Sequence, residues 1–171
     1  MNQLYLIRHA KSSWSDPDLD DFRRPLNQRG KKNALEMGRR LGSLAVCPDL
    51  IATSPAKRAR KTAAAIASGC GCKKAVIRHF DDLYLGTRAF HLELIGRLAA
   101  DVAVLFVVGH NPAITDLAEH LTGMNLGNVP TCGVIGLEYA AEIPFAEQST
   151  SGKLLFYDFP KRWRLDEQTG G

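Results

Sequence analysis

Short apolar runs alternate with longer segments of helical spacing through the first 121 residues of the chain. Residues 4–7 (LYLI) predict a buried strand, and residues 103–108 (AVLFVV) are the strongest strand signal in the sequence. An unbroken apolar run of that length indicates burial on both faces, as in a parallel sheet. Four further strands are predicted at residues 49–53, 75–78, 134–140 and 153–159.

Two helices are predicted between the first three strands. Residues 27–44 carry apolar side chains on one face, and the first of them, an asparagine, is a suitable N-cap. Ser54 as N-cap and Pro55 as the first helical residue predict the start of the second helix. This helix runs through an alanine-rich segment, and Gly69 and Gly71 are expected to stop it.

Two more helices follow along the chain. Residues 89–99 predict a third helix, preceded by a loop at residues 81–86. Asn111 and Pro112 repeat the combination of cap and proline at the start of a fourth helix, which runs to about Leu121. Because strands and helices alternate in this way, the sequence predicts an α/β fold.

Composition sets broad limits on the protein class. The 171 residues fit one domain, residues 1–171, and the 45% apolar content is typical of a globular protein. No apolar run approaches the roughly 20 residues that span a bilayer, and no signal peptide is recognisable. We therefore expect a cytoplasmic protein with no membrane partner. Its four cysteines lack the spacing of a zinc site and are expected to be reduced.

Basic side chains follow three of the predicted strands. Arg8 and His9 end the first strand, Arg58 lies in the first turn of the helix after the second, and His110 ends the strand at residues 103–108. Because ligands bind beyond the carboxyl ends of parallel strands, we expect these groups to converge at one edge. Two helix starts add partial positive charge there. Two arginines and two histidines predict an anion site, best suited to a phosphoryl group.

Other readings of these residues are weaker. Taken alone, Arg58 is more often a solvated helix charge, and His110 is as often a buried imidazole as a functional one. The chain lacks a G-x-S-x-G nucleophile elbow and a G-x-x-x-x-G-K-[ST] phosphate loop. Its five histidines show no metal-ligand spacing, so no metal and no cofactor are expected. Histidine itself remains as the candidate nucleophile.

Four motifs follow one another along the chain: Arg8-His9-Ala10, Arg24-Pro25-Leu26-Asn27-Gln28-Arg29-Gly30, Ser54-Pro55-x-x-Arg58-Ala59-x-x-Thr62 and Gly109-His110-Asn111-Pro112. Together they resemble the histidine phosphatase (phosphoglycerate mutase-like) superfamily over about residues 4–122. The short chain and the last motif are most similar to its SixA-type phosphohistidine phosphatase branch. The resemblance implies a three-layer α/β/α fold with a mostly parallel central sheet.

By this resemblance His9 takes up the phosphoryl group as a phosphohistidine, while Arg8, Arg58 and His110 hold the phosphoryl oxygens. The partner would be a phosphohistidine-bearing protein. Two positions depart from the family pattern: Ala10 replaces the usual glycine, and Ser15 replaces a frequent asparagine.

A third departure concerns the proton donor. The chain has no long insertion between Arg58 and His110, where larger relatives carry an acidic residue. Asp81 and Asp82 are the candidates in the loop after the third strand; Asp82 is preferred, although a carboxylate capping a turn fits it equally well. A site poor in acids suits phosphohistidine better than phosphate esters, because an imidazole leaves more easily than an alkoxide.

Two rival functions remain open from sequence. One is a broad phosphomonoesterase for small molecules, or a mutase, on the same fold. The other is a non-catalytic module that binds phosphate or nucleic acid, although the basic residues lack interleaved aromatic side chains for stacking bases. Its basic patch would comprise Lys57, Arg58, Arg60, Lys61, Arg39 and Arg40.

Overall fold

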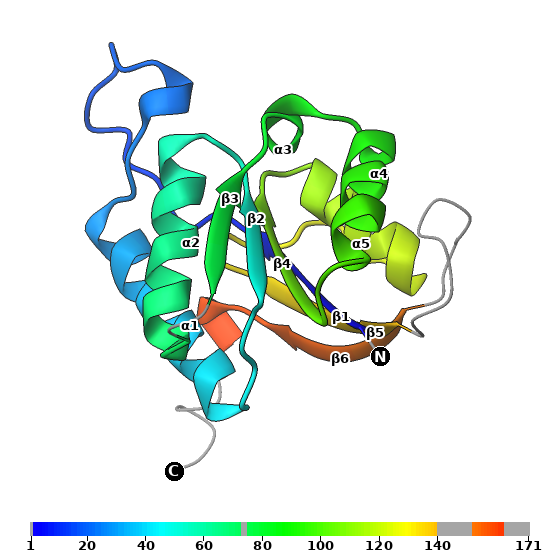
Figure 1. Ribbon diagram of the computed structural model, residues 1–171. Helices are drawn as coiled ribbons and strands as arrows, with labels where there is room; N and C mark the ends of the chain where they lie inside the picture. The colour runs from blue at the N-terminus through cyan, green and yellow to red at the C-terminus, as the bar shows by residue number, and fades with distance from the viewer. Residues whose placement is uncertain (1, 73–74, 140–151, 163–171) are drawn as a thin grey trace.

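The chain forms one six-stranded sheet with helices on both faces, as the computed structural model shows for residues 2–72, 75–139 and 152–162 (Figure 1). The strand order is β3-β2-β4-β1-β5-β6. The first four strands in this order pair in parallel, while β5 and β6 join through antiparallel pairs. The expected mostly parallel α/β sheet is therefore confirmed. The strands are β1 (Asn2–Arg8), β2 (Leu50–Thr53), β3 (Val76–His79), β4 (Val104–Gly109), β5 (Val134–Tyr139) and β6 (Lys153–Asp158).

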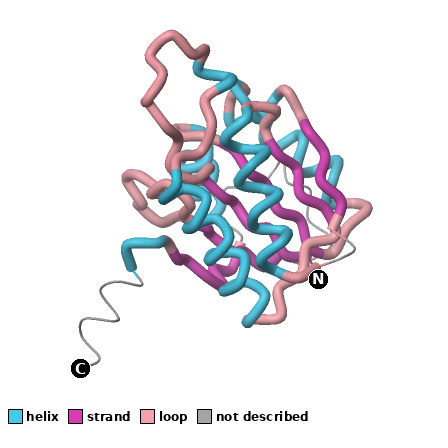
Figure 2. The backbone as a smooth tube through the Cα atoms, turned by 90° about the vertical axis from the view of Figure 1, so that its left-hand side faces the viewer, coloured by secondary structure: helices cyan, strands magenta, loops and turns pink. Residues whose placement is uncertain are grey.

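The helices form two outer layers (Figures 1 and 2). The helices α1 (Gln28–Ser43) and α2 (Lys57–Cys70) cover one face. The short α3 (Asp82–Leu85), with α4 (Arg88–Ala99) and α5 (Ala113–Thr122), covers the other face. Each layer has its own apolar core, because alternate side chains of the buried strands point to opposite faces of the sheet. The α/β/α arrangement implied by the family resemblance is confirmed.

Strand register brings three chain segments to one level at the carboxyl edge of the sheet. Arg8 of β1 pairs with Gly109 of β4, and Thr53 of β2 pairs with Val108. The residues that follow these strand ends therefore leave the sheet side by side. This placement follows from parallel pairing alone, before any side chain is considered.

The helices α1 and α2 approach each other at backbone distance. A Cβ atom added to Gly69 would lie 2.4 Å from the carbonyl oxygen of Leu35, and one added to Gly38 would lie 2.4 Å from that of Ile66. Gly69 was expected to stop the second helix, and this is wrong because Gly69 packs against α1 inside α2. Gly71, which adopts a left-handed conformation with φ 70°, ends the helix instead.

Two helices begin later than predicted, because the side chains expected to cap them form other hydrogen bonds. The helix α2 begins at Lys57, since Ser54 Oγ accepts a hydrogen bond from the N–H of Ala56 in the turn before it. The helix α5 begins at Ala113, and the side chain of Asn111 donates instead to the carbonyl oxygen of Val129 (3.1 Å). The capping prediction holds for α1, whose N-cap Asn27 accepts from the N–H of Gly30.

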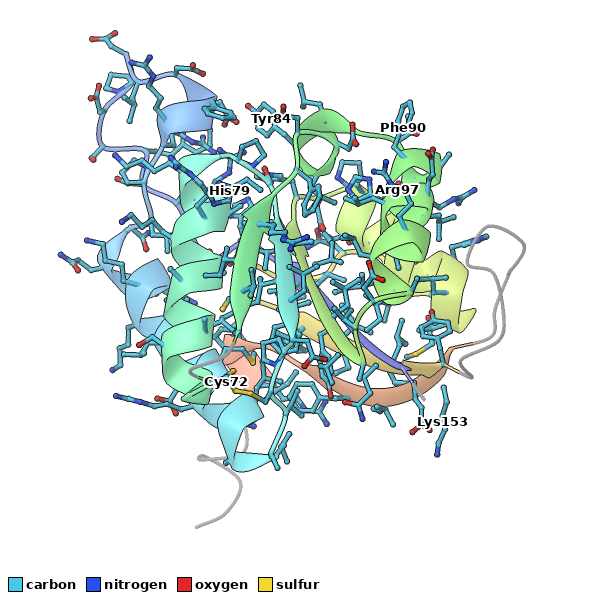
Figure 3. All side chains as sticks on the ribbon, viewed as in Figure 1. Cys72, His79, Tyr84, Phe90, Arg97 and Lys153 are labelled. Atoms are coloured by element: carbon cyan, nitrogen blue, oxygen red, sulfur yellow. A yellow bond between two sulfur atoms is a disulfide. The ribbon has the colours of Figure 1, made fainter. Side chains whose placement is uncertain are left out.

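Two other expectations were wrong. Residues 82–85, expected in a loop, form the single turn α3, which buries Leu83 in the core. Cys47 and Cys72 form a disulfide rather than two free thiols, because the ends of α1 and α2 bring residues 25 positions apart together. Cys72 lies at the end of α2 away from Tyr84 (Figure 3). No helix in the described part of the chain is long and apolar enough to cross a membrane.

Candidate active site

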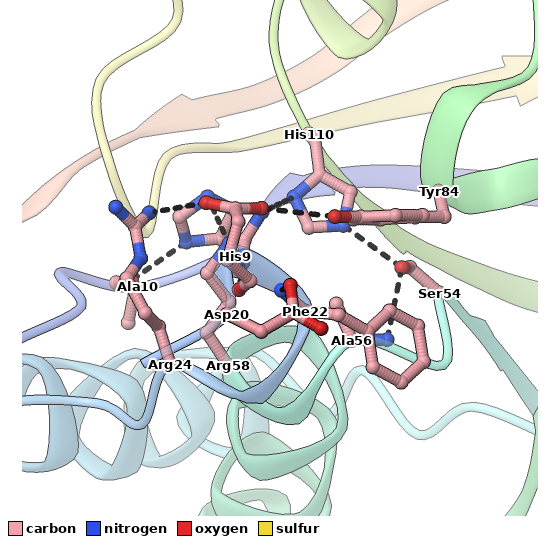
Figure 4. Close-up of polar contacts among 11 residues, drawn as sticks. His9, Ala10, Asp20, Phe22, Arg24, Ser54, Ala56, Arg58, Tyr84 and His110 are labelled. Carbon is pink, nitrogen blue, oxygen red and sulfur yellow. Dashed lines mark hydrogen bonds and ion pairs between the residues drawn. The ribbon is translucent and has the colours of Figure 1, made fainter. Parts of the chain in front are cut away.

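His9 leaves β1 with its ring held in one tautomer. Its Nδ1 lies 2.8 Å from the carbonyl oxygen of Ala10, so Nδ1 carries the proton and donates. Its Nε2 lies 3.3 Å from Nε of Arg58, which donates to it. The unprotonated Nε2 therefore points to the arginine, the side chain best suited to bind a phosphoryl group (Figure 4).

Arg58 is the centre of the site. It lies in the first turn of α2 and is buried, with only 5% of its surface exposed. Besides the contact with His9, its Nη2 lies 3.3 Å from Nδ1 of His110, and its Nη1 donates to the carbonyl oxygen of Asp21 (2.6 Å). One guanidinium thus joins both imidazoles, as the sequence predicted for residues separated by as many as 101 positions in the chain.

His110 is also held in one tautomer. Because Arg58 can only donate, Nδ1 of His110 accepts, and its Nε2 donates to Ser54 Oγ at 2.8 Å. The imidazole rings of His9 and His110 lie 4.9 Å apart between their centroids. Ser54, predicted only as a helix cap, therefore positions the second imidazole.

Burial and neighbouring cations keep both imidazoles neutral. Burial is the largest cause that lowers the pKa of His9 to about 4, and the charges of Arg58, Arg8 and Arg24 lower it further, against the hydrogen bond to Ala10. Burial and the charges of His9 and Arg58 lower the pKa of His110 to about 3. At neutral pH, both rings are therefore uncharged, and each has one unprotonated nitrogen that accepts a hydrogen bond from Arg58.

Arg8 precedes His9 in the chain, and its side chain is held by the segment before β5. Its Nη1 donates to the carbonyl oxygen of Val129 (2.6 Å) and to Asn128 Oδ1 (3.3 Å), in the segment before β5. Its Nε is buried without a hydrogen-bond partner among the described residues. Burial lowers the pKa of Arg8, but a guanidinium stays charged at physiological pH. Arg8 therefore keeps donor capacity for an anion close to His9.

Asp82, the predicted proton donor, is exposed in the first turn of α3. Among the described residues, no hydrogen bond or ion pair connects its carboxylate with either imidazole. The carboxylate at the site belongs to Asp21, in the turn η1 (Asp21–Arg23), where its Oδ2 lies 2.9 Å from Nη2 of Arg58. The hydroxyl of Tyr84 donates to the same oxygen at 3.0 Å.

Sequence reasoning missed Asp21, Tyr84 and Arg24 as site residues. Arg24 is buried, with 7% of its surface exposed, and pairs with Asp21 Oδ1 at 3.0 Å. Its Nε and Nη1 have no partner among the described residues, and its guanidinium lies 3.5 Å above the ring of Trp14. The available signal was the long polar connection at residues 12–25, since connections of that length in compact domains are often functional.

The structure explains the two substitutions relative to the family pattern, Ala10 and Ser15. Ala10 is fully buried, and its N–H donates to Thr62 Oγ1 at 3.0 Å. The non-glycine residues with positive φ in the described ranges are Ala45 and Cys132, so position 10 does not need a glycine. Ser15 is exposed and bonds with Ser13 within the loop, away from the imidazoles.

The described residues hold no group of three or more His, Cys, Asp or Glu side chains placed to bind a metal ion. Three of the six residues in the basic patch of the rival nucleic-acid module are buried or ion-paired. Arg58 is buried within the site, Arg40 pairs with Asp158 (2.8 Å), and Arg39 pairs with Glu36 (3.4 Å). Lys57, Arg60 and Lys61 stay exposed on α2.

Two neutral imidazoles around a buried arginine, at the carboxyl edge of an α/β/α sheet, form a site suited to a phosphoryl group. Residues 4–91 match the family model of the histidine phosphatase superfamily (branch 1). The chain belongs to that superfamily.

Relatives in sequence include two uncharacterized proteins. One, from Picosynechococcus sp., is 32% identical over 170 residues, which cover 95% of this chain and 99% of the relative. The other, a chloroplastic protein of Arabidopsis thaliana, is 32% identical over 144 residues, which cover 80% of this chain and 66% of the relative. Probable phosphoglycerate mutases also match, for example that of Cronobacter sakazakii, at 31% identity over half of this chain.

Solved structures place the chain beside the SixA branch. A candidate phosphohistidine phosphatase SixA from Agrobacterium tumefaciens is 28% identical, with a TM-score of 0.79 over 93% of this chain and 98% of that one. The protein histidine phosphatase SixA complexed with tungstate shares the fold, with a TM-score of 0.80 at 18% identity over 94% and 99% of the two chains. A mycobacterial glucosyl-3-phosphoglycerate phosphatase has the same fold at 17% identity and a TM-score of 0.70, over 94% and 100% of the two chains.

Proposed function

We propose that this phosphatase removes the phosphoryl group from phosphohistidine in proteins, and that His9 carries the group during turnover. The observation that supports the proposal most directly is the tautomer of His9. Its Nδ1 proton is held by the carbonyl oxygen of Ala10, and its unprotonated Nε2 accepts a hydrogen bond from Nε of Arg58 at 3.3 Å. A neutral imidazole with a fixed tautomer can act as a nucleophile once this donor turns to an incoming phosphoryl oxygen.

In the proposed reaction, Nε2 of His9 attacks phosphorus, and the P–N bond to the substrate imidazole breaks as that nitrogen takes a proton from solvent. Water then attacks phosphorylated His9, which releases inorganic phosphate and restores the neutral ring. Arg58 and Arg8 donate to the phosphoryl oxygens in both steps, where negative charge must be stabilised. His110 contacts Nη2 of Arg58 and would lie beside the same phosphoryl oxygens.

The state of the Asp21 carboxylate supports a P–N rather than a P–O substrate. Partial burial alone would raise the pKa of Asp21, but hydrogen bonds from Tyr84 and Arg58 and the charges of Arg58 and Arg24 lower it overall. The carboxylate is therefore ionised at neutral pH and has no proton to give to an alkoxide. A leaving imidazole can be protonated by solvent near neutral pH, so it needs no such acid.

The test is to trap the phosphoenzyme. Incubation with a radiolabelled phosphohistidine peptide should label the wild-type chain with an acid-labile phosphate. His9→Ala should lose the label and at least about 1,000-fold of turnover, with an unchanged circular dichroism spectrum. His120→Ala, in the last turn of α5, is the matched control and should keep both. Normal turnover by His9→Ala would overturn the proposal.

The alternative is a phosphomonoesterase for small molecules. It would need Asp21 in its protonated form to supply a proton to the leaving alkoxide, which the lowered pKa of Asp21 opposes at neutral pH. The two functions separate in one comparison of kcat/KM for a phosphohistidine peptide and for a series of phosphate monoesters. A strong preference for the monoesters, with activity rising as pH falls, would favour the alternative.

A further inference from the structure

A cavity of about 330 Å³ lies against Arg8. Its lining contains four cations and three neutral residues, and no acidic or aromatic side chain. The cations come from the end of β1, the start of α1 and the segment after β6. They are Arg8, Lys11, Arg29 and Lys161, and the neutral residues are Asn128, Pro130 and Thr131.

The charges in this cavity are not balanced within the described residues. Lys11, Arg29 and Lys161 are exposed, and none of them takes part in an ion pair there. Arg29 also lies in the first turn of α1, which contains no acidic residue, although the helix dipole favours negative charge at that end. Like charges gathered in this way repel one another until an anion joins them.

A cavity elsewhere in the molecule shows the contrast. The cavity of about 210 Å³ near the amino ends of β2 and β4 is lined by Asp49, Asp101 and Arg78 together with apolar residues, so its charges are mixed. The two cavities therefore differ in the charge of their linings, and only the one beside Arg8 is lined by cations without a carboxylate. Arg8 is common to this cavity and to the site around His9.

The shape of the lining distinguishes between anions. A compact second phosphate is best bound by buried donors that converge, whereas three of these four cations are exposed and stand on separate segments. Bases of a single-stranded nucleic acid need aromatic side chains to stack on, and none lines the cavity. Several carboxylates spread along a polypeptide match exposed cations on flexible stems, and Asn128 and Thr131 can bond to its backbone.

We infer that this cavity docks an acidic segment of the phosphoprotein substrate, next to the phosphohistidine that His9 attacks. The inference rests on the proposed function and adds the chemistry by which the substrate is selected. Arg8 contacts the segment before β5 and lines the cavity, so it lies between the phosphoryl group and the flanking carboxylates. Complementary charge of this kind raises the rate of encounter and falls with salt.

The test compares two triple variants that remove three positive charges each. Lys11→Gln, Arg29→Gln and Lys161→Gln remove three of the four positive charges that line the cavity but leave Arg8, His9 and Arg58 untouched. Arg39→Gln, Arg78→Gln and Lys153→Gln form the control, since these exposed cations do not line the cavity. Each variant is assayed with a phosphohistidine peptide flanked by Asp and Glu, with the same peptide flanked by Ala, and with phosphoramidate.

The cavity variant should lose about 30-fold in kcat/KM on the acidic peptide, about threefold for each exposed pair. Its kcat/KM for the Ala peptide and for phosphoramidate should stay within about twofold of wild type. The control variant should behave as wild type on all three donors. Equal losses on all donors, or no loss on the acidic peptide, would overturn the inference.

Binding of the unphosphorylated acidic peptide, measured by fluorescence anisotropy, separates this inference from the proposed function. Wild-type chain should bind the acidic peptide with a salt-dependent Kd, and the cavity variant should bind it about 30-fold more weakly. This result would hold even if no phosphohistidine donor were hydrolysed, which would remove the proposed function alone. Preferential binding of single-stranded DNA over the acidic peptide would contradict the inference.

Discussion

The two ends of the sheet differ in whether their polar groups have hydrogen-bond partners. At the amino ends of the strands, the Asp49 carboxylate accepts hydrogen bonds from the backbone N–H groups of Ala103 (3.0 Å) and Val104 (2.9 Å). At the carboxyl ends, Nε of Arg8 and both Nε and Nη1 of Arg24 are buried without partners among the described residues. An unpaired buried donor costs about 1–3 kcal/mol. The first end is therefore built for stability, and the second for a ligand that supplies acceptors.

The contrast extends to the ionisable groups. Asp49, at the first end, is exposed and satisfied by backbone groups. At the second end, His9 and His110 are kept neutral by burial and by cations, at a cost to folding at low pH. Variants at the two ends should consequently separate activity from stability.

After His9 itself, the largest effect is expected at Arg58. Arg58→Ala removes a donor that contacts both imidazoles, so transition-state stabilisation should fall by about 3 kcal/mol, or roughly 150-fold in kcat/KM. Arg60→Ala, on the exposed side of the same helix, is the control and should change kcat/KM by less than about twofold. Steady-state kinetics on a phosphohistidine peptide measure both. Equal effects at the two positions would remove Arg58 from the site.

The pH dependence of stability should report the neutral histidines. The unfolded chain protonates its imidazoles near pH 6.5, whereas the folded chain protonates His9 only near pH 4 and His110 near pH 3. As pH falls below 6.5 the unfolded state therefore takes up protons first. The free energy of unfolding should drop by about 1.4 kcal/mol per pH unit for each histidine, and should not change from this cause above pH 6.5.

Urea denaturation of wild type and His110→Gln, at several values between about pH 7 and pH 5, measures this drop. The variant lacks one of the two titrating rings, so its free energy of unfolding should fall less steeply with decreasing pH. Identical slopes for the two proteins would mean that His110 is not held neutral by its surroundings.

At the opposite end of the sheet, Asp49→Asn should lower the free energy of unfolding by about 1–2 kcal/mol, because charge-assisted bonds to two N–H groups become neutral ones. The kcat/KM should not change, since this end lies away from the imidazoles. Asp101→Asn, from the same cavity, serves as the control and should change stability less. A loss of activity in Asp49→Asn without loss of stability would break the comparison.

The smallest effect is expected at Asp21. Its carboxylate pairs with Arg58 and Arg24, so it competes with any anion for the same donors. Asp21→Asn should strengthen competitive inhibition by inorganic phosphate by about threefold to fivefold, as expected for a partly exposed ion pair. Asp82→Asn should leave the inhibition constant unchanged. If Asp82→Asn instead lowered kcat, the predicted acid at position 82 would be restored and Asp21 would lose its importance.

Much of the fold could be predicted from local pattern. The strand at residues 103–108 is apolar throughout because it is buried on both faces, and that feature alone placed it in the centre of a parallel sheet. Parallel pairing then requires Arg8, His9, Arg58 and His110 to share an edge. Their convergence was predictable because strand ends position Arg8, His9 and His110, and the helix that starts just after β2 positions Arg58.

The rest of the site depends on contacts that no local pattern contains. Asp21 and Arg24 reach Arg58 through a long connection whose path is decided by tertiary packing. Tyr84 reaches Asp21 because residues 82–85 form a helical turn, which a four-residue window does not distinguish from a loop. The Cys47–Cys72 disulfide likewise depends on two helix ends meeting in space.

The glycine contact between α1 and α2 has a consequence for how the enzyme meets its substrate. Gly38 and Gly69 allow the backbones of α1 and α2 to pack in direct contact. Arg58 lies at the opposite end of α2 from Gly69. The guanidinium is thereby preset during folding, before any phosphoryl group arrives. An incoming anion encounters a rigid receptor, and little of its binding energy is consumed in organising the arginine.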